Sequence, residues 1–372
     1  MADGVVFSEH GGSLGGSGFS LPLVEGYDEE EWAGLEPFFY DEAEAVADHE
    51  RRMRREQMQA RLEELRKRGL EAYDRIQDYD RKQGGHYFTR SYMAAFNEFD
   101  IDEESPLGPM RYARTVYGKD DLPRLYNTVN ILSMKIVSLD VNLPIHVYGT
   151  VVGRDNLDRK CVYVFRRDRN NCQVIKYKDQ PLILEGPKRG LVLMPDGAFF
   201  EIDLKIKDIR QKRLQRQRDR ELSKGFVSIN GIRTLKKCEV ESKSLATRLS
   251  TIEVTCAVVR RGVEAIIAIE VIRGLFNGKI TACTTSIPNS LLLHDSKLAD
   301  EKAPGVKGVI QLLQPVITVH LSDMLIIETQ TGDGIPKHTI EFSPMMSGAE
   351  EDVITVGVTK MRVKVTWSVL KV

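Results

Sequence analysis

The feature that most constrains the fold is a strict alternation of side chains in MRVKVTWSV, residues 361–369. Every second position is apolar, and the positions between are polar: Met361, Val363, Val365, Trp367 and Val369 against Arg362, Lys364, Thr366 and Ser368. Successive side chains of a strand point to opposite faces of a sheet, whereas a helix would scatter this pattern around its axis. The stretch is therefore predicted to be a strand with one buried and one wet face, held in a sheet up to the last residues.

Short segments of the same kind recur from about Leu122 onward, with turn residues between them. Examples are PIHVYGTVV, CVYVF, FFEIDLKI, VEAIIAIEV and PVITVH. No helical pattern separates them, which favours antiparallel sheets over parallel sheets joined by helices. The apolar fraction of 42% is enough for a core. We predict a mainly β domain over residues 122–372, built as an antiparallel two-sheet sandwich or a barrel-like sheet.

The chain before this domain divides into three parts by composition. Residues 1–27 are rich in Gly and Ser and are predicted to be a disordered tail. Residues 28–84 begin acidic and turn basic, and no proline occurs between Asp41 and Lys82, so a long charged α-helix is predicted there. Residues 85–121 mix aromatics with Pro, Gly and acidic residues, which indicates a connector that packs on the β domain.

The predicted helix carries a narrow apolar stripe. Leu62 and Tyr73 are eleven residues apart, as are Leu65 and Ile76. An eleven-residue spacing keeps side chains on one face of a straight helix. A stripe this narrow is typical of a helix that docks on one partner surface, and also of a solvated helix with no partner. These four residues are the candidates for contact with an unidentified protein partner.

Two cysteines bracket the basic stretch CVYVFRRDRNNCQVI, residues 161–175. Residues 168–171 have turn chemistry, so the stretch is predicted to be a hairpin that brings Cys161 and Cys172 close across a strand pair. A disulfide between directly paired strands is geometrically awkward, and a metal would need two further ligands. The five cysteines are odd in number and form no CxxC. We expect free thiols in a reducing compartment, cytoplasmic or nuclear, with no metal or cofactor.

Basic side chains are the candidates for recognition within the β domain. Arg166, Arg167 and Arg169 lie at the predicted hairpin tip, where they are either solvated or face a phosphate. Lys188 and Arg189 lie in GPKRGL, which has the Gly and Lys of a phosphate loop without its spacing. The simpler interpretation of that stretch is a tight turn between strands.

Two basic blocks, residues 51–68 and 205–224, raise the alternative of nucleic-acid binding. Neither block is interleaved with stacking aromatics, and glutamates interrupt the first, so a solvated helix face and a solvated loop are favoured. Lys plus Arg number 53 against 54 for Asp plus Glu, so the net charge selects no partner class.

The sequence gives little or no indication of a signal peptide, a membrane span, a calcium site or a catalytic site. The first residues lack the pattern of a signal peptide, and no apolar run reaches membrane-spanning length, so neither secretion nor a membrane span is expected. Asp155 and Asp158 lie among basic residues and predict a turn better than a calcium site. His294 adjoins Asp295, but a catalytic pair also needs a nucleophile, and nucleotide-loop, protease and kinase motifs are missing. Enzymatic activity is therefore not expected.

Several separated blocks resemble one known family. GTVVGRDNLDRKCVYVFRRDRNNCQVI, LILEGPKRGLVL, EIDLKIKD and the final VTKMRVKVTWSVL are similar to the grass-plant family defined by domain of unknown function 6598, over roughly residues 95–372. The resemblance implies a cereal protein with a β-rich module that has no established activity or site residues. Some relatives carry this module beside a ribosome-inactivating N-glycosidase domain, for which the segment before residue 95 is too short.

The residues and the resemblance together predict a β-rich module that serves binding or interaction and not catalysis. An accessory or defence-related role linked to the ribosome-inactivating relatives is the alternative. Nucleic-acid binding through the basic blocks is the third option.

Overall fold

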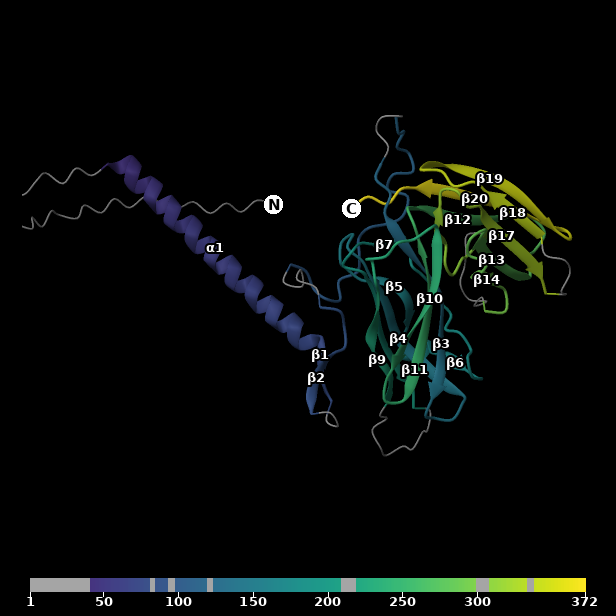
Figure 1. Ribbon diagram of the computed structural model, residues 1–372, viewed down its shortest axis with the longest axis horizontal. Coiled ribbons are helices and arrows are strands. Elements are labelled where there is room, and N and C mark those ends of the chain that lie inside the picture. The colour runs from purple at the N-terminus through teal and green to yellow at the C-terminus, as the bar shows by residue number, and fades with distance from the viewer. Residues whose placement is uncertain are drawn as a thin grey trace, which may run out of the picture. The chain divides into compact units, whose positions relative to one another are not determined.

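The computed structural model describes residues 41–80, 84–92, 98–118, 123–208, 219–298, 308–332 and 338–372. The chain forms two compact units, Met1–Arg61 and Leu62–Val372. Helix α1 (Glu42–Arg75) has residues in both units, and the β-rich part belongs to the second (Figure 1). The predicted tail (residues 1–27), the start of the predicted helical segment (28–40) and residues 209–218 of the basic block at 205–224 lie outside the described residues.

Helix α1 is long, charged and solvated, as the sequence predicted. Asp41 begins it, because its Oδ1 accepts hydrogen bonds from the backbone N–H groups of Ala43 (2.9 Å) and Glu44 (3.2 Å). Charged pairs one turn apart follow along the surface, such as Arg54 and Glu50 at 3.1 Å. Such exposed pairs contribute only a few tenths of a kcal/mol each, so packing near the helix C-terminus matters more for stability.

The helix ends at Arg75, before the proline-free stretch is finished. The carbonyl of Ile76 accepts hydrogen bonds from the backbone N–H (2.7 Å) and the hydroxyl (3.0 Å) of Thr89, and Ile76 itself is fully buried. Strand β1 (Gln77–Asp80) then pairs antiparallel with β2 (Gly85–Phe88). The prediction of helix up to residue 84 is therefore wrong at its end, because tertiary hydrogen bonds and a hairpin replace the last helical turns.

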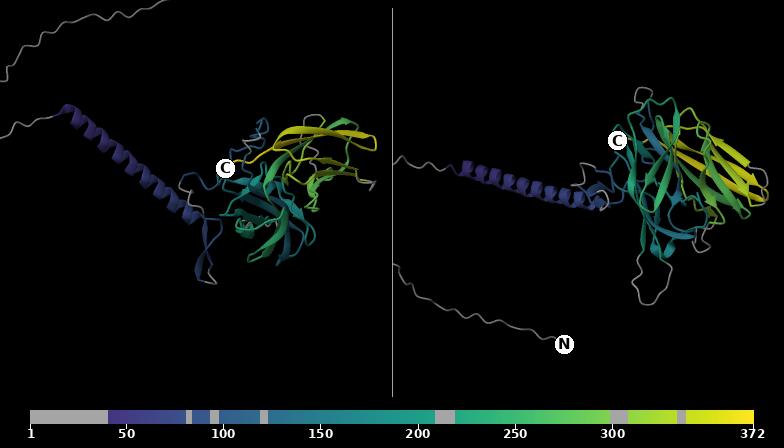
Figure 2. Two further views of the ribbon diagram at one scale, coloured as in Figure 1. Left: turned by 45° about the horizontal axis from the view of Figure 1, so that its top comes forward. Right: turned by 60° about the horizontal axis from the view of Figure 1, so that its bottom comes forward.

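The first part of the β-rich unit is a sandwich of two antiparallel sheets, drawn in teal and green in Figures 1 and 2. One sheet has the order β10–β11–β3–β7, and the other has β5–β4–β8–β9 with β6 also paired to β4. The strands are β3 (Asn127–Leu139), β4 (Ile145–Arg154), β5 (Val162–Arg167), β6 (Gln173–Ile175), β7 (Leu191–Leu193), β8 (Ala198–Ile206), β9 (Arg220–Ile229), β10 (Cys238–Ala246) and β11 (Ser250–Val259). Inward side chains from both sheets, including Ile131, Val151 and Phe200, bury one another in a first core.

The second part is another sandwich with its own core. Its sheets have the orders β15–β12–β20–β19, with β16 also on β12, and β14–β13–β17–β18. The strands are β12 (Gly262–Arg273), β13 (Gly278–Thr284), β14 (Leu291–Asp295), β15 (Val309–Ile310), β16 (Val316–His320), β17 (Leu325–Thr331), β18 (His338–Phe342), β19 (Ser347–Val356) and β20 (Thr359–Ser368). Ile267, Ile327 and Trp367 belong to this second core.

The predicted fold class, mainly antiparallel β behind a charged helix, is confirmed, and the described strands close no barrel. The number of cores differs from the prediction, because residues 122–372 hold two sandwiches where one two-sheet sandwich was expected. The predicted alternation in β20 is also present: Met361, Val363, Val365 and Trp367 are buried. Ser368 is the exception on the polar face, and its Oγ accepts a hydrogen bond from the Tyr112 N–H (3.1 Å), so a connector residue covers it.

The seam between the two sandwiches contains several buried polar contacts. The Asn130 side chain on β3 bonds to the backbone of Thr318 on β16, accepting from its N–H (2.8 Å) and donating to its carbonyl (2.7 Å). Thr128 donates to the Thr318 hydroxyl at 2.7 Å. The carboxylate of buried Glu264 on β12 accepts hydrogen bonds from the backbone N–H groups of Gly190 (2.7 Å) and Met110 (3.0 Å). Because these buried polar groups have partners, the seam costs little desolvation and sets one register of the two sandwiches.

Candidate functional site

The predicted hairpin at residues 168–171 is not formed. Strand β5 pairs with β4 at Gly149–Gly153, and β6 pairs with the same edge of β4 at Ile145–Val147. The chain therefore continues along β4 and makes only a short 3-10 turn at Arg169–Asn171. Cys161 and Cys172 are consequently separated and are both free thiols.

The three arginines predicted at that tip each contact a carboxylate of the chain. Arg166 lies 3.3 Å from a Glu104 oxygen, and its guanidinium stands 4.4 Å from the Tyr163 ring centroid. Arg167 is paired with Glu185 at 2.5 Å. Arg169 is paired with Asp219 at 2.7 Å, and this contact, with a hydrogen bond from Tyr148, holds the pKa of Asp219 well below its usual range. Their charges are thus compensated locally, which weakens the case for a phosphate site here.

The two basic residues of GPKRGL have opposite environments. The Lys188 side chain is 78% exposed and lies 3.8 Å from Glu104. The Arg189 side chain is 1% exposed, and all five of its N–H donors have acceptors on Ser105, Asp155, Asp158 and Gly190. Arg189, a candidate interaction residue from the sequence, is therefore occupied within the protein: its two carboxylate partners enclose it, and it joins the connector to the first sandwich.

A second buried arginine was not singled out from the sequence. Arg154, fully buried at the end of β4, is ion-paired with Glu201 on β8 at 2.9 Å and donates to the carbonyl of Arg159 at 2.9 Å. Glu201 also accepts from Arg90 (2.8 Å). Burial raises the pKa of the nearby Cys161 thiol, which donates to the Ile101 carbonyl. This network, like that of Arg189, has its charges matched, and its contacts support a structural role in anchoring the connector.

The four residues of the predicted helix stripe differ in their burial. Ile76 is buried against Ala72 and Ile101, so it belongs to the chain's own packing and offers no docking surface. Leu62 is 59% exposed, and Leu65 is half-buried. Tyr73 is 40% exposed and belongs to a cluster of exposed aromatic rings described below.

Other candidate chemistry is accounted for by local contacts. The ring nitrogens of His294 lie 3.2 Å from the Gln311 carbonyl and 3.2 Å from the Ser296 hydroxyl, whereas Asp295 contacts Lys279 at 3.3 Å and does not orient the ring. Within the described ranges, no group of three or more His, Cys, Asp or Glu side chains is arranged to hold a metal ion. No helix among those residues has the length and apolarity needed to cross a bilayer.

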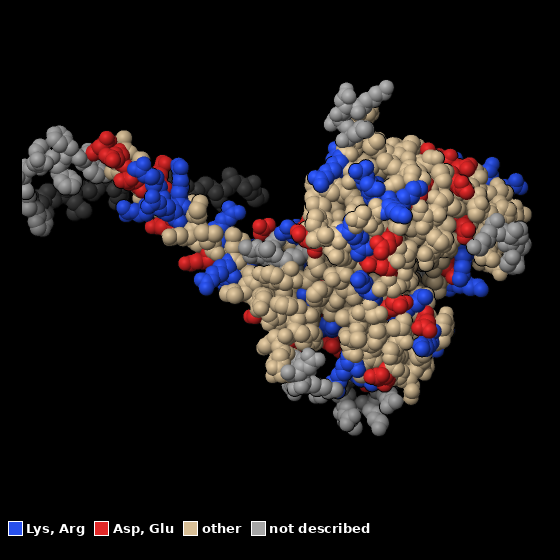
Figure 3. Space-filling model, viewed as in Figure 1, with Lys and Arg blue, Asp and Glu red and all other residues tan. Residues whose placement is uncertain are grey.

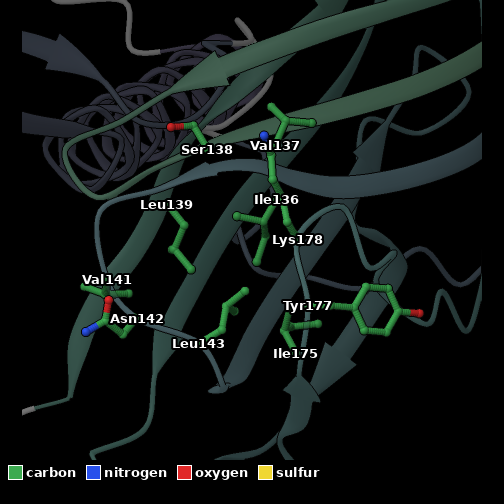
Figure 4. Close-up of a pocket in the computed structure, with 10 residues that line it drawn as sticks. All are labelled: Ile136, Val137, Ser138, Leu139, Val141, Asn142, Leu143, Ile175, Tyr177 and Lys178. Carbon is green, nitrogen blue, oxygen red and sulfur yellow. The ribbon is translucent and has the colours of Figure 1, made fainter.

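One cavity of about 360 Å³ opens at an end of the first sandwich (Figure 4). Ile136, Leu139, Leu143 and Ile175 approach one another around it, whereas the ring of Tyr177 points away. These aliphatic side chains belong to the first core or pack against it, so the cavity is an opening into that core. It presents few convergent polar groups, and shape alone gives a site little specificity.

A larger cavity, about 720 Å³, lies at the seam and is lined by three arginines, Arg124, Arg260 and Arg261. We call it the arginine cavity. The remaining lining residues are mostly apolar: Pro123, Leu125, Tyr126, Asn127, Leu193, Met194, Pro195, Gly231, Leu321 and Met346. The cavity therefore combines a set of cations with an apolar wall.

Local structure holds the three arginines in place. Arg260 and Arg261 form the tight turn from β11 to β12, and Arg261 adopts a left-handed backbone with φ of 48°. The Arg261 N–H donates to the Asn127 side chain at 3.2 Å, and the Arg260 guanidinium donates to the Lys236 carbonyl at 3.3 Å. The Arg124 guanidinium stands 5.4 Å from the Tyr126 ring centroid.

The field at this cavity is positive. None of the described lining residues is acidic, and none of the three arginines forms an ion pair within the described part of the chain. Burial lowers the pKa of neighbouring His320, and the charges of Lys237, Arg260 and Arg261 lower it further, against an opposing effect of Asp323. In Figure 3, the face near β7 and β12 shows several groups of Lys and Arg atoms, with Asp and Glu atoms beside them. A hollow with three guanidiniums and no carboxylate among its described lining residues favours an anion.

Two glycines in or beside the cavity have no room for a side chain. A Cβ on Gly231 would lie 1.7 Å from the Met194 carbonyl oxygen, and a Cβ on Gly262 would lie 2.4 Å from the Thr128 hydroxyl. Gly231 permits close approach to the Met194 backbone, and Gly262 leaves room for the Thr128 side chain. The arginine pair in VVRRGV was visible in the sequence, but the apolar wall comes from distant segments that carry Leu125, Leu193 and Leu321.

Comparison with known proteins gives a family and little else. A family model with the description "Domain of unknown function (DUF6598)" matches residues 128–365, a range that contains most of both cores. No curated protein matches the chain. Human GIVD cytosolic phospholipase A2 is similar at 9% identity, over 67% of this chain and 31% of that chain, with a TM-score of 0.22. The same human enzyme in complex with methyl gamma-linolenyl fluorophosphonate gives 7% identity, coverage of 66% and 32%, and a TM-score of 0.20. The chain spans about a third of that enzyme, and TM-scores this low support no argument about fold or activity.

Proposed function

The chain belongs to the family of domain of unknown function 6598, and since that description carries no activity, we propose its function from the arginine cavity. The β-rich unit is a binding module that holds an anionic ligand there and does not transform it. The observation that carries the proposal is the group of three arginines around one 720 Å³ hollow with no acidic residue among its described lining. Arg167 and Arg189, elsewhere in the unit, are paired with carboxylates of the chain.

Like charges held together in one hollow destabilise the empty state, and an anion relieves that repulsion while forming charge-assisted hydrogen bonds. We expect the purified chain to bind inorganic phosphate in calorimetry at low ionic strength, with affinity falling as salt is added because the outer guanidiniums are screened. Charged hydrogen bonds contribute about 1.5–3 kcal/mol each. The double variant Arg260→Gln/Arg261→Gln should therefore lose at least about tenfold in affinity.

Arg248→Gln is the matched control for this experiment. Arg248 is an exposed arginine just before β11, at the opposite end of the strand that Arg260 and Arg261 follow. The control should bind phosphate as the unaltered protein does. No binding by the unaltered protein at low salt, or an equal loss in the control, would disprove the assignment.

A second binding function is favoured by an exposed aromatic cluster near the end of α1. Tyr73, Phe88 and Tyr92 are 40%, 43% and 60% exposed, and the centroid distances from Tyr73 to the other two rings are 5.8 and 5.9 Å. Exposed aromatics that touch one another are typical of protein–protein contact sites. This observation supports the predicted protein partner at the helix. Substituting Tyr92 with Ser should abolish a cross-link to that partner in cells while the thermal midpoint stays the same.

The other predicted roles remain separate proposals. A defence-related role beside ribosome-inactivating relatives, in a cereal, would be supported by adenine release from ribosomal RNA. Nucleic-acid binding through residues 51–68 would be supported by affinity for RNA that falls steeply with salt. The five cysteines, all free, support the expectation of a reducing cytoplasmic or nuclear setting.

A further inference from the structure

We propose that the ligand of the arginine cavity is a small anionic amphiphile, an alkyl phosphate or alkyl carboxylate whose chain lies on the apolar wall. The inference rests on the proposed anion-binding function and extends it from the charged head to the whole ligand.

The size of the cavity is the first argument. Liquid water occupies about 30 Å³ per molecule, so 720 Å³ has room for about two dozen molecules of that size. An inorganic phosphate ion has five heavy atoms and fills only a minor part of this space. Cavities of 300–1,000 Å³ hold ligands that are mostly enclosed by apolar side chains, with a few polar groups that orient them.

The nature of the wall is the second argument. Leu193 belongs to the first core, whereas Leu125, Leu321 and Met346 are half-buried and pack against the second. The wall thus continues both cores to the cavity surface, and an alkyl chain placed there would remove apolar area of both from water. Met194 and Met346 have flexible thioether side chains, which suit a chain of variable length better than a rigid ring.

The distribution of charge sets the direction of the ligand. Arg124 and Arg261 are exposed and Arg260 is half-buried, whereas Leu193 is only 3% exposed. The cations therefore lie toward solvent and the apolar residues toward the seam. An amphiphile fits with its anionic head at the guanidiniums and its chain pointing inward. A neutral lipid would leave the arginines uncompensated, and a bare anion would leave the apolar wall wet.

A ligand series on the unaltered full-length chain tests this arrangement. The probes are inorganic phosphate, butyl phosphate and octyl phosphate, each below its micelle concentration, with octyltrimethylammonium as the cationic counterpart. Each methylene buried contributes about 0.8 kcal/mol, or about a fourfold gain in affinity. Even if only two or three methylenes reach the wall, octyl phosphate should bind at least about tenfold more tightly than phosphate. Octyltrimethylammonium should bind at least tenfold more weakly than octyl phosphate.

Variants of the apolar wall test where the alkyl chain of the ligand lies. Met346→Gln should lower the ratio of octyl phosphate to phosphate affinity at least threefold, because it makes the wall polar. Met58→Gln is the control, since Met58 is 65% exposed on α1 and lies outside the cavity lining. It should leave that ratio unchanged. If Met346→Gln does not fold, the ligand series on the unaltered protein still decides the matter.

The outcomes separate the two proposals. Equal affinity for phosphate and octyl phosphate would keep the anion site and overturn the amphiphile. Equal affinity for the anionic and cationic octyl compounds would overturn the inference, because binding would then depend on the octyl chain alone and not on the anionic head. Binding of none of the probes would remove the anion site and the amphiphile together. Tighter octyl phosphate binding with a loss in Met346→Gln supports the arrangement proposed.

Discussion

Replacement of Arg189 by Met should destabilise the β-rich unit far more than replacement of Lys188, the other charged residue of GPKRGL. The Arg189 guanidinium donates to Asp155 at 2.7 and 3.0 Å, to Asp158 at 2.9 Å, to Ser105 at 3.2 Å and to the Gly190 carbonyl at 3.0 Å. Its side chain is 1% exposed, and that of Asp155 is fully buried. Met has a similar length but no donors, so the substitution leaves a buried carboxylate with no cation.

The magnitude follows from that uncompensated charge. Breaking a buried ion pair by removing one partner costs about 3–5 kcal/mol, because the remaining charge stays desolvated. The Asp155 carboxylate would keep only the backbone N–H groups of Val192 (2.8 Å) and Leu157 (3.3 Å). Lys188→Met is the adjacent control: it removes an exposed contact 3.8 Å from Glu104, for which about 0–1 kcal/mol is expected.

Urea unfolding followed by circular dichroism measures the difference. With a slope near 3 kcal/mol per molar, the Arg189→Met midpoint should fall by about 1 M or more, and the Lys188→Met midpoint by less than about 0.3 M. Adding Asp155→Asn to Arg189→Met should recover part of the loss, since it removes the stranded charge and keeps an acceptor for Val192. Equal midpoints for the two single variants, or no recovery in the double variant, would refute the reasoning.

Three further predictions follow from other contacts. Gly231→Ala should lower the free energy of unfolding by about 1–3 kcal/mol, because its Cβ would lie 1.7 Å from the Met194 carbonyl oxygen; an unchanged urea midpoint would contradict this. The pKa of His320, followed by NMR, should lie below about 6.5 because of burial and nearby cations. The unfolded protein therefore protonates His320 more readily than the folded protein, so the contribution of neutral His320 to stability is lost as pH falls below about 6.5. Bound phosphate should raise the pKa of His320, and a pKa that phosphate leaves unchanged would argue against an anion near this residue. Iodoacetamide should label half-buried Cys172 before Cys161, whose burial raises its thiol pKa; peptide mass spectrometry showing the reverse order would mean that the Arg154 network opens.

Strand existence was predictable from the sequence because side-chain alternation is a local property. The residues of β20 carry their period-2 pattern without reference to any partner, and the pattern was read correctly up to Trp367. The status of Ser368 was not predictable, because it depends on a connector residue, Tyr112, that lies 256 positions earlier.

Strand pairing was less predictable, for a physical reason that residues 161–175 illustrate. Turn residues at 168–171 signal only that the backbone leaves the strand. They do not say whether the next strand reverses and pairs with β5 or continues past the end of β5 along the edge of β4. Strand β4 offers one long edge, and both β5 and β6 satisfy their backbone groups on it. The pairing is thus decided by a third segment, which no pattern within the stretch records.

Burial of charge was the least predictable property. Lys188 and Arg189 are neighbours with the same sign, yet one is solvated and the other enclosed. The difference comes from Asp155 and Asp158, more than thirty positions earlier, whose geometry suits a forked guanidinium and not an ammonium. In a turn, sequence gives the type of charge, and the tertiary partner gives its environment.

The arginine cavity depends on the division into two cores that the sequence did not predict. A single sandwich has an interior and a surface, whereas two sandwiches also have a seam, where surfaces already partly apolar face each other. Leu193 comes to this seam from the first core, and Leu321 from the edge of the second. The turn that joins the two sandwiches carries Arg260 and Arg261 to the same place. Apolar wall and cations therefore meet because the connection between the cores runs past their junction, so a variant that disrupts the seam at Asn130 should weaken ligand binding together with stability.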